Sequence, residues 1–280
     1  MIMKNQLVEY KRFIKYDRVF WRGFFSHTGA LLFAIVLLIL VHEVGHYLAY
    51  VWKGYEDASI RITPFFGMTS TTQVILPEDF AFIALGGTLL NLTLAILVVV
   101  ITRSIKSSYT LPFRMYPVMV FLIEGVVILA GLFFDQTITD FSWLVELGLS
   151  QVWVAVIGLV FILIGGYLSY EIWILLGFHQ YHPVIALVIV NIPYVLYFLV
   201  GYLIGQRLLP DGMEAIKSIL FICMVLQLVC LTIRILLAPV IFDLLLRKRT
   251  TYQQQITKWA SIFNISLGCV AMMMSFLVLN

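Results

Sequence analysis

The chain has 280 residues and a formal net charge of +3 at pH 7; 62% of its residues are hydrophobic and only 12% are charged. Soluble domains carry roughly 25% charged residues, and the mean hydropathy of this chain is +1.01. The composition therefore excludes a water-soluble fold and predicts an integral membrane protein.

Residues 1 to 27 form a basic N-terminal segment. Over residues 7 to 25 the cations are mixed with aliphatic and aromatic side chains, which is typical of an amphipathic helix on an anionic leaflet. We therefore expect this segment to bind the lipid bilayer and not nucleic acid. The apolar run that follows is too long for a signal peptide, so we expect the first membrane span to be retained. The cations are Lys4, Lys11, Arg12, Lys15, Arg18 and Arg22.

Spanning a bilayer takes about 20 mostly apolar residues, and seven stretches of the chain meet this requirement. We therefore predict an all-α polytopic membrane protein with about seven transmembrane helices. The predicted spans are residues 28–52, 80–102, 116–134, 151–177, 183–205, 216–240 and 260–279.

The connection between the first two spans, residues 53–79, differs from the rest of the chain. Residues 59–63 alternate at the strand period and residues 69–75 are rich in strand formers, which predicts a short β-hairpin or a re-entrant loop. Exposed strand edges can bind an extended peptide through main-chain hydrogen bonds. We therefore expect residues 60 to 72 to clamp a substrate; the alternative is a plain connecting loop.

The distribution of cations predicts the topology. With the N-terminus in the cytoplasm, the opposite side receives only Lys53, Arg61, Arg207 and Lys217. Arg234 falls within a span, and the other Lys and Arg residues face the cytoplasm. The positive-inside rule therefore predicts a cytoplasmic N-terminus.

The first span contains His42, Glu43 and His46, although a charged group at mid-bilayer costs about 2.5–3.5 kcal/mol. Residues four apart lie on the same face of a helix, so both histidines can bind one Zn²⁺ ion, with Glu43 beside the activated water. Glu43 can then take a proton as that water attacks a carbonyl. The alternative is a structural His/Glu hydrogen-bond cluster or a degenerate site without metal.

The run from His42 to Ala49, HEVGHYLA, resembles the site-2-type intramembrane zinc metalloproteases. Residues 84–92, ALGGTLLNL, are similar to that family's small-Gly-x-x-x-Asn signature, with Thr88 where the family usually has Pro. The resemblance implies that Gly87 and Asn91 help to hold substrate near the metal. The structural alternatives are close helix packing at the glycines and an interhelical hydrogen bond from Asn91.

The family usually supplies a third ligand from a Leu-Asp-Gly motif, and no full copy of this motif occurs here. Asp140 opens an Asp-x-x-x-Leu-x-x-x-Gly stretch similar to one in divergent members, so we predict it as the third ligand. Asp135 and Asp211 are the alternatives, because the predicted topology brings all three to the same side of the membrane. The structural alternative for Asp140 is the N-cap of a short interfacial helix.

Three further ionisable residues, Glu124, Glu171 and Arg234, fall within predicted spans. Opposite charges in a helix bundle tend to pair, so we expect these residues to form structural ion pairs or to extend toward the membrane surface. Glu171 is also the candidate third ligand if the chain belongs to the other membrane-embedded class of zincins.

These features predict a zinc-dependent intramembrane endopeptidase that cuts a membrane protein or a membrane-anchored peptide. Its catalytic three-helix core would cover residues 28–150, and residues 151–280 would form additional transmembrane helices, which the resemblance hardly covers. The alternative function is a non-proteolytic scaffold, chaperone or transporter with a structural or degenerate metal site.

Overall fold

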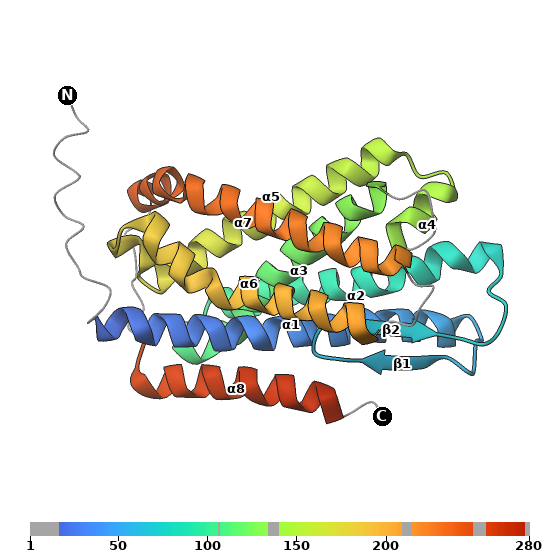
Figure 1. Ribbon diagram of the computed structural model, residues 1–280, viewed down its shortest axis with the longest axis horizontal. Coiled ribbons are helices and arrows are strands. Elements are labelled where there is room, and N and C mark those ends of the chain that lie inside the picture. The colour runs from blue at the N-terminus through green and yellow to red at the C-terminus, as the bar shows by residue number, and fades with distance from the viewer. Residues whose placement is uncertain (1–16, 106, 134–139, 209–213, 249–255, 278–280) are drawn as a thin grey trace.

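The computed structural model of the protein describes residues 17–105, 107–133, 140–208, 214–248 and 256–277. Long helices run side by side along one axis, and a two-stranded hairpin lies at one end (Figure 1). The predicted helical bundle with a hairpin between its first two spans is therefore confirmed. The helices are α1 (Arg18–Trp52), α2 (Pro77–Arg103), α3 (Leu111–Ala130), α4 (Asp140–Glu146), α5 (Gln151–Leu175), α6 (Pro183–Leu208), α7 (Glu214–Lys248) and α8 (Lys258–Leu277).

Six helices in the described part of the chain are long and apolar enough to cross a membrane: α1, α2, α3 with its flanking turns, α5, α6 and α7. Many of their large apolar side chains face outward, and Leu163, Val100 and Leu236 are 71%, 65% and 64% exposed. Such surfaces suit contact with lipid. The protein is therefore a multi-pass membrane protein. The seventh predicted span corresponds to α8, which is not among the six, so the count of seven is not confirmed.

Helix α1 has 35 residues and begins directly after Asp17, whose side chain accepts a hydrogen bond from the backbone N–H of Val19. It continues without a break across residue 27, where the sequence predicts a boundary between the N-terminal segment and the core. Phe20 is fully buried and packs against Phe178 and Tyr181 rather than lipid. Residues 1–16, the rest of the predicted amphipathic segment, lie outside the described residues.

Helices α1 and α2 approach each other closely through glycine. A Cβ atom on Gly45 would lie 2.3 Å from the carbonyl oxygen of Gly86, and one on Gly86 would lie 2.7 Å from the carbonyl oxygen of Gly45. Only glycine permits this separation of the two backbones. Gly86 thus has the packing role expected of small residues, and the contact brings α2 directly over the His42–His46 turn of α1.

The hairpin consists of β1 (Ser59–Ile62) and β2 (Gly67–Ser70), which pair antiparallel with Ser59 opposite Ser70. At its open end, Asp57 before β1 accepts hydrogen bonds from Thr71 and Thr72 after β2, which joins the two chain segments. These bonds lower the pKa of Asp57 to about 2, so the carboxylate is ionised at neutral pH. The hairpin is thereby held as a defined element beside α1.

Helix α6 supports the turn of the hairpin. The hydroxyl of Tyr197 donates to the carbonyl oxygen of Pro64, and the rings of Phe65 and Tyr197 lie 5.4 Å apart. A helix from the second half of the chain therefore contacts the element that covers α1.

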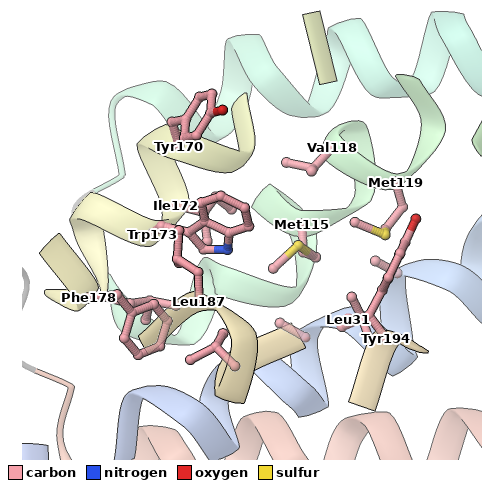
Figure 2. Close-up of a cluster of buried hydrophobic side chains, with 14 of the residues drawn as sticks. Leu31, Met115, Val118, Met119, Tyr170, Ile172, Trp173, Phe178, Leu187 and Tyr194 are labelled. Atoms are coloured by element: carbon pink, nitrogen blue, oxygen red, sulfur yellow. The ribbon is translucent and has the colours of Figure 1, made fainter. Parts of the chain in front are cut away.

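Among the described residues the hydrophobic core has three parts, and the two smaller ones position the site. The main cluster includes Trp173, Tyr194 and Met115 from different helices (Figure 2). A second cluster contains Tyr50, Tyr55 and Ile83, and Lys53 adds an ion pair of 2.8 Å to Asp79 that joins the end of α1 to the start of α2.

The third cluster fixes α4 by burying Phe141 and Leu144 against Ile128 of α3 and Val154 of α5. The rings of Phe80 and Trp143 also stack at 4.4 Å, which joins α2 to α4. This short helix begins with Asp140, so its packing determines where that carboxylate lies.

Candidate metal centre

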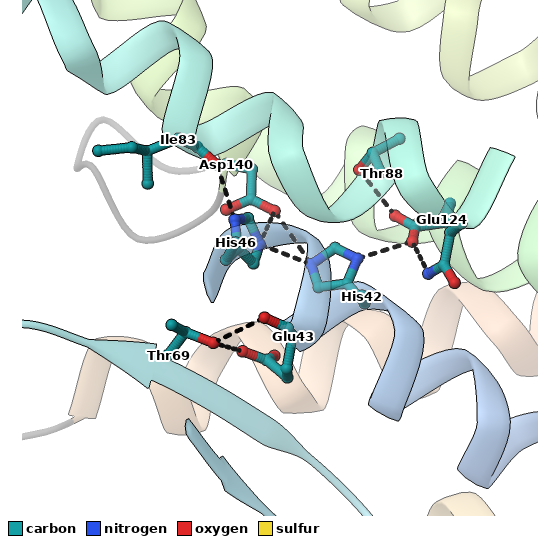
Figure 3. Close-up of polar contacts among 9 residues, drawn as sticks. His42, Glu43, His46, Thr69, Ile83, Thr88, Glu124 and Asp140 are labelled. Carbon is teal, nitrogen blue, oxygen red and sulfur yellow. Dashed lines mark hydrogen bonds and ion pairs between the residues drawn. The ribbon is translucent and has the colours of Figure 1, made fainter. Parts of the chain in front are cut away.

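Three ligand atoms from two helices converge at the end of the bundle that carries the hairpin (Figure 3). The Nε2 atoms of His42 and His46 are 3.0 Å apart, and the Oδ2 atom of Asp140 lies 3.3 Å from each of them. The helical repeat places both imidazoles on one face of α1, and the anchored start of α4 supplies the carboxylate. The structure thus brings together the two histidines and the aspartate predicted as third ligand.

The contacts of the two Nδ1 atoms determine whether the Nε2 atoms of His42 and His46 can bind a cation. His42 Nδ1 lies 2.8 Å from Glu124 Oε1, and His46 Nδ1 lies 2.7 Å from the carbonyl oxygen of Ile83. Both partners are hydrogen-bond acceptors, so each neutral imidazole carries its proton on Nδ1 and keeps a lone pair on Nε2. Two nitrogen lone pairs and a carboxylate oxygen therefore face one another, an arrangement that a shared cation satisfies.

The spacing and the free space also fit a metal ion. Metal–ligand distances of about 2.0–2.1 Å in a tetrahedral site separate the ligand atoms by about 3.3–3.4 Å, close to the observed 3.0, 3.3 and 3.3 Å. On the α2 side, a Cβ atom on Gly87 would lie 2.6 Å from His46 Nε2 and 2.8 Å from His42 Nε2. The absence of a side chain at Gly87 leaves the space in front of both nitrogens open.

Asp140 is suited to pair with a cation. Burial alone raises the pKa of Asp140, but protonated His42 and His46 rings that donate to its carboxylate outweigh burial and hold that pKa well below the ordinary value of an aspartate. The carboxylate therefore carries a negative charge next to the two imidazoles.

Glu124 is a residue of this site that the sequence did not identify. It lies in α3, is 2% exposed, and contacts His42 Nδ1 as described above. Its carboxylate also accepts hydrogen bonds from Asn91 Nδ2 at 2.7 Å and Thr88 Oγ1 at 3.1 Å. A carboxylate behind a ligating imidazole fixes the tautomer and orientation of the ring. Its only signal in the sequence is its place as the lone carboxylate in the apolar run of α3.

Replacing Glu124 by glutamine should weaken metal binding by about 10–100-fold, because the amide is a poorer acceptor for the His42 N–H. Competition with a chelator of known affinity, followed by metal analysis, measures the effect. Glu146→Gln is the matched control, since Glu146 is exposed on α4 and should bind metal as the wild type does. Equal affinities for all three proteins would exclude a supporting role for Glu124.

Glu43 lies between α1 and the hairpin. Its Oε2 atom is 2.7 Å from Thr69 Oγ1, and that hydroxyl is also 3.1 Å from the Glu43 carbonyl oxygen (Figure 3). A Cβ atom on Gly67 would lie 2.3 Å from Glu43 Cγ, so only glycine at this point of β2 leaves room for the glutamate. The hairpin therefore holds the side chain predicted as general base.

The remaining predicted site residues have different positions. Asn91 is fully buried behind His42; besides its bond to Glu124, its Oδ1 atom accepts a hydrogen bond from the Tyr116 hydroxyl at 2.8 Å. The predicted interhelical hydrogen bond is therefore present, and the substrate contact of Asn91 stays a prediction. Asp135 and Asp211 lie outside the described residues.

The three ionisable residues predicted to pair or to extend toward the membrane surface have different surroundings. Glu124 contacts His42, and Glu171 accepts a hydrogen bond from Tyr167 at 3.0 Å. Arg234 forms no ion pair with any carboxylate that the structure describes. Over these same residues, His42, His46 and Asp140 are the one group of three His, Cys, Asp or Glu side chains whose ligand atoms converge.

The fold and the site together define a class: a multi-pass membrane protein with a His-His-Asp cluster that can hold a metal ion between a transmembrane helix and a short helix. No family model, no curated protein sequence and no solved structure matches the chain.

Proposed function

We propose that the protein is a zinc-dependent intramembrane endopeptidase of the site-2 type. The observation that carries the proposal is the convergence of His42, His46 and Asp140 directly beside Glu43 on a helix apolar enough to cross a membrane. Buried ionisable groups in membrane spans are costly and usually have a function.

Zinc is the metal that this donor set favours. Catalytic zinc sites use three protein ligands of the imidazole and carboxylate type and keep one position for water or substrate. When bound, zinc supplies a Lewis acid that polarises a carbonyl and activates water. His42, His46 and Asp140 would hold the ion, and Glu124 would hold the His42 ring in place.

Glu43 performs the proton transfers in this proposal. It accepts a proton from the attacking water and returns it to the nitrogen of the departing peptide, so its charge is restored at the end of the cycle. Thr69 donates to the Glu43 carboxylate at 2.7 Å and orients it for this role.

The substrate class that we propose is a membrane protein or a membrane-anchored peptide. A helical substrate hides its peptide bonds, so it must unwind before cleavage. The hairpin has two strands, and an extended peptide can add to a free strand edge through main-chain hydrogen bonds. Since β2 contacts Glu43 through Thr69, a peptide bound along residues 60 to 72 would lie near the general base.

We also propose that the N-terminus faces the cytoplasm, from the excess of Lys and Arg on that side. Helix α1 then runs outward, so that the hairpin and the metal centre belong to the half of the membrane away from the cytoplasm.

Metal analysis of purified wild type and of Asp140→Asn tests the proposal. We expect about one zinc per chain in the wild type, and a large loss of metal and of cleavage of a model transmembrane peptide in Asp140→Asn, because an amide is a poor zinc ligand. Asp135→Asn and Asp211→Asn are the matched controls and should retain both.

Three results would contradict the proposal. A wild-type protein without stoichiometric metal, after purification free of chelators, would exclude a zinc hydrolase. Loss of metal only in Asp211→Asn or Asp135→Asn would show that Asp140 is not the ligand. Metal binding without cleavage of any membrane peptide would instead favour a scaffold, chaperone or transporter.

A further inference from the structure

A second polar site lies in the bundle, away from the metal centre. It includes His27 of α1, which lies about 22 Å before His42 along the helix at 1.5 Å per residue. A cavity is present here, and its lining includes His27, Arg234, Trp173 and Tyr194. Trp173 and Tyr194, together with the lining residue Met115, are drawn in Figure 2. The proposed proteolytic function uses none of these residues.

His27 presents a hydrogen-bond donor that has no acceptor. The indole N–H of Trp173 can only donate, and it lies 3.4 Å from His27 Nε2, so Nε2 is the acceptor and the proton of the neutral ring is on Nδ1. His27 Nδ1 is buried and has no hydrogen-bond partner among the described residues. An unpaired buried donor is unfavourable.

Arg234 adds a buried positive charge that no carboxylate among the described residues neutralises. It is 7% exposed, and in the described ranges no carboxylate forms an ion pair with it. It has a side-chain hydrogen bond with Tyr194, its Nε lies 3.4 Å from the carbonyl oxygen of Cys230, and the guanidinium carbon lies 5.7 Å from the centre of the Trp173 ring. A guanidinium has five N–H donors and no acceptor.

The two hydroxyl groups that line the cavity, those of Tyr194 and Ser169, donate their protons to acceptors of the protein. The Tyr194 hydroxyl donates to Gln227 Oε1, and the Ser169 hydroxyl donates to the carbonyl oxygen of Gly166 at 2.7 Å. The cavity therefore combines the unpaired His27 donor with a positive charge that no described carboxylate compensates, and a ligand that only accepts hydrogen bonds complements it.

We propose that this cavity binds a compact inorganic anion of the size of chloride, held by the Arg234 guanidinium and the His27 Nδ1–H. Water also accepts hydrogen bonds, but it leaves the positive charge without a counter-ion in an apolar bundle, which is costly. The cavity leaves about 10 Å³ for the centre of a water-sized ligand, which is room for one compact ligand. A lipid headgroup or a peptide is therefore too large.

Thermal unfolding of the purified full-length protein in detergent tests this site. Sodium chloride replaces sodium gluconate at constant ionic strength, so that only the identity of the anion changes. Because a ligand that binds only the folded state stabilises it, we expect a saturable rise of Tm, on the order of 5 °C for the wild type. Sodium bromide should give the same rise.

Two variants identify the residues. Arg234→Gln should lose the saturable rise, and His27→Phe should need at least about tenfold more chloride for half of the effect, because it removes one donor from the anion. His27→Phe leaves no new unpaired charge, so it keeps the test informative if Arg234→Gln does not fold. Arg103→Gln is the control: Arg103 is exposed at the end of α2, and this variant should respond as the wild type does.

A wild-type Tm that does not depend on chloride at constant ionic strength would overturn the proposal, as would an unchanged response in His27→Phe and Arg234→Gln. The zinc content of the same preparations reports on His42, His46 and Asp140 independently. Failure of the anion site is therefore distinguishable from failure of the metal site.

Discussion

Replacing Glu43 by glutamine is expected to leave the metal content unchanged and to lower the rate of peptide cleavage by about 10²–10⁴-fold. Glutamine has nearly the shape of glutamate and can still accept the hydrogen bond from Thr69, which is 2.7 Å long in the wild type. It cannot take a proton from water. Metal analysis and single-turnover cleavage of a transmembrane peptide, performed on the same preparation, separate the two effects.

The control for this variant is Glu56→Gln, since Glu56 is exposed in the connection before the hairpin. It should bind metal and cleave peptide as the wild type does. Cleavage by Glu43→Gln at the wild-type rate would show that Glu43 is not the general base. Loss of both the metal and the cleavage activity would indicate that Glu43 helps to hold the metal, which contradicts its role as a general base alone.

Replacing Gly87 by alanine should weaken metal binding by at least about 100-fold, more than the 10–100-fold typical of residues that only support a ligand. The new methyl group would lie 2.6 Å from His46 Nε2 and 2.8 Å from His42 Nε2, in the space in front of both nitrogens. Helix α2 cannot move away easily, because the Gly45–Gly86 contact joins its backbone to α1. Chelator competition measures the metal affinity.

Gly166→Ala is the matched control for this change. Gly166 is also a buried helical glycine, but its added Cβ atom would meet the Arg234 side chain at 3.6 Å, which is ordinary van der Waals contact. Its metal affinity should equal that of the wild type. Wild-type affinity in Gly87→Ala would mean that no metal occupies the space between the two imidazoles and α2.

Local patterns in the sequence predicted several parts of this structure. The apolar runs predicted the long helices because burial of backbone polar groups in lipid requires helices of about 20 residues. The strand-period alternation of residues 59–63 predicted the hairpin, which the structure confirms. The four-residue spacing of His42 and His46 predicted convergent imidazoles, since the helical repeat alone determines that geometry.

Other parts depend on how the helices are rotated and packed against one another. The sequence predicted a structural ion pair or an interfacial position for Glu124, but the orientation of α3 turns it toward His42, with Asn91 and Thr88 as further partners. Likewise, opposite charges in spans tend to pair, yet Arg234 lies beside Trp173 and lines a cavity with His27. The periodicity of one segment predicts which side chains share a face, but it does not predict which residue of a distant helix they contact.

The sequence by itself determined that this is a membrane-embedded helical protein with two histidines and a glutamate on one turn of its first span. Hydropathy and helical spacing are local properties, which the chain carries before it folds. Only the tertiary structure decided that α4 delivers Asp140 to both imidazoles, that Gly87 leaves the space before them open, and that β2 holds Glu43. These features arise from packing between segments far apart in sequence, where shape and backbone approach decide which groups meet.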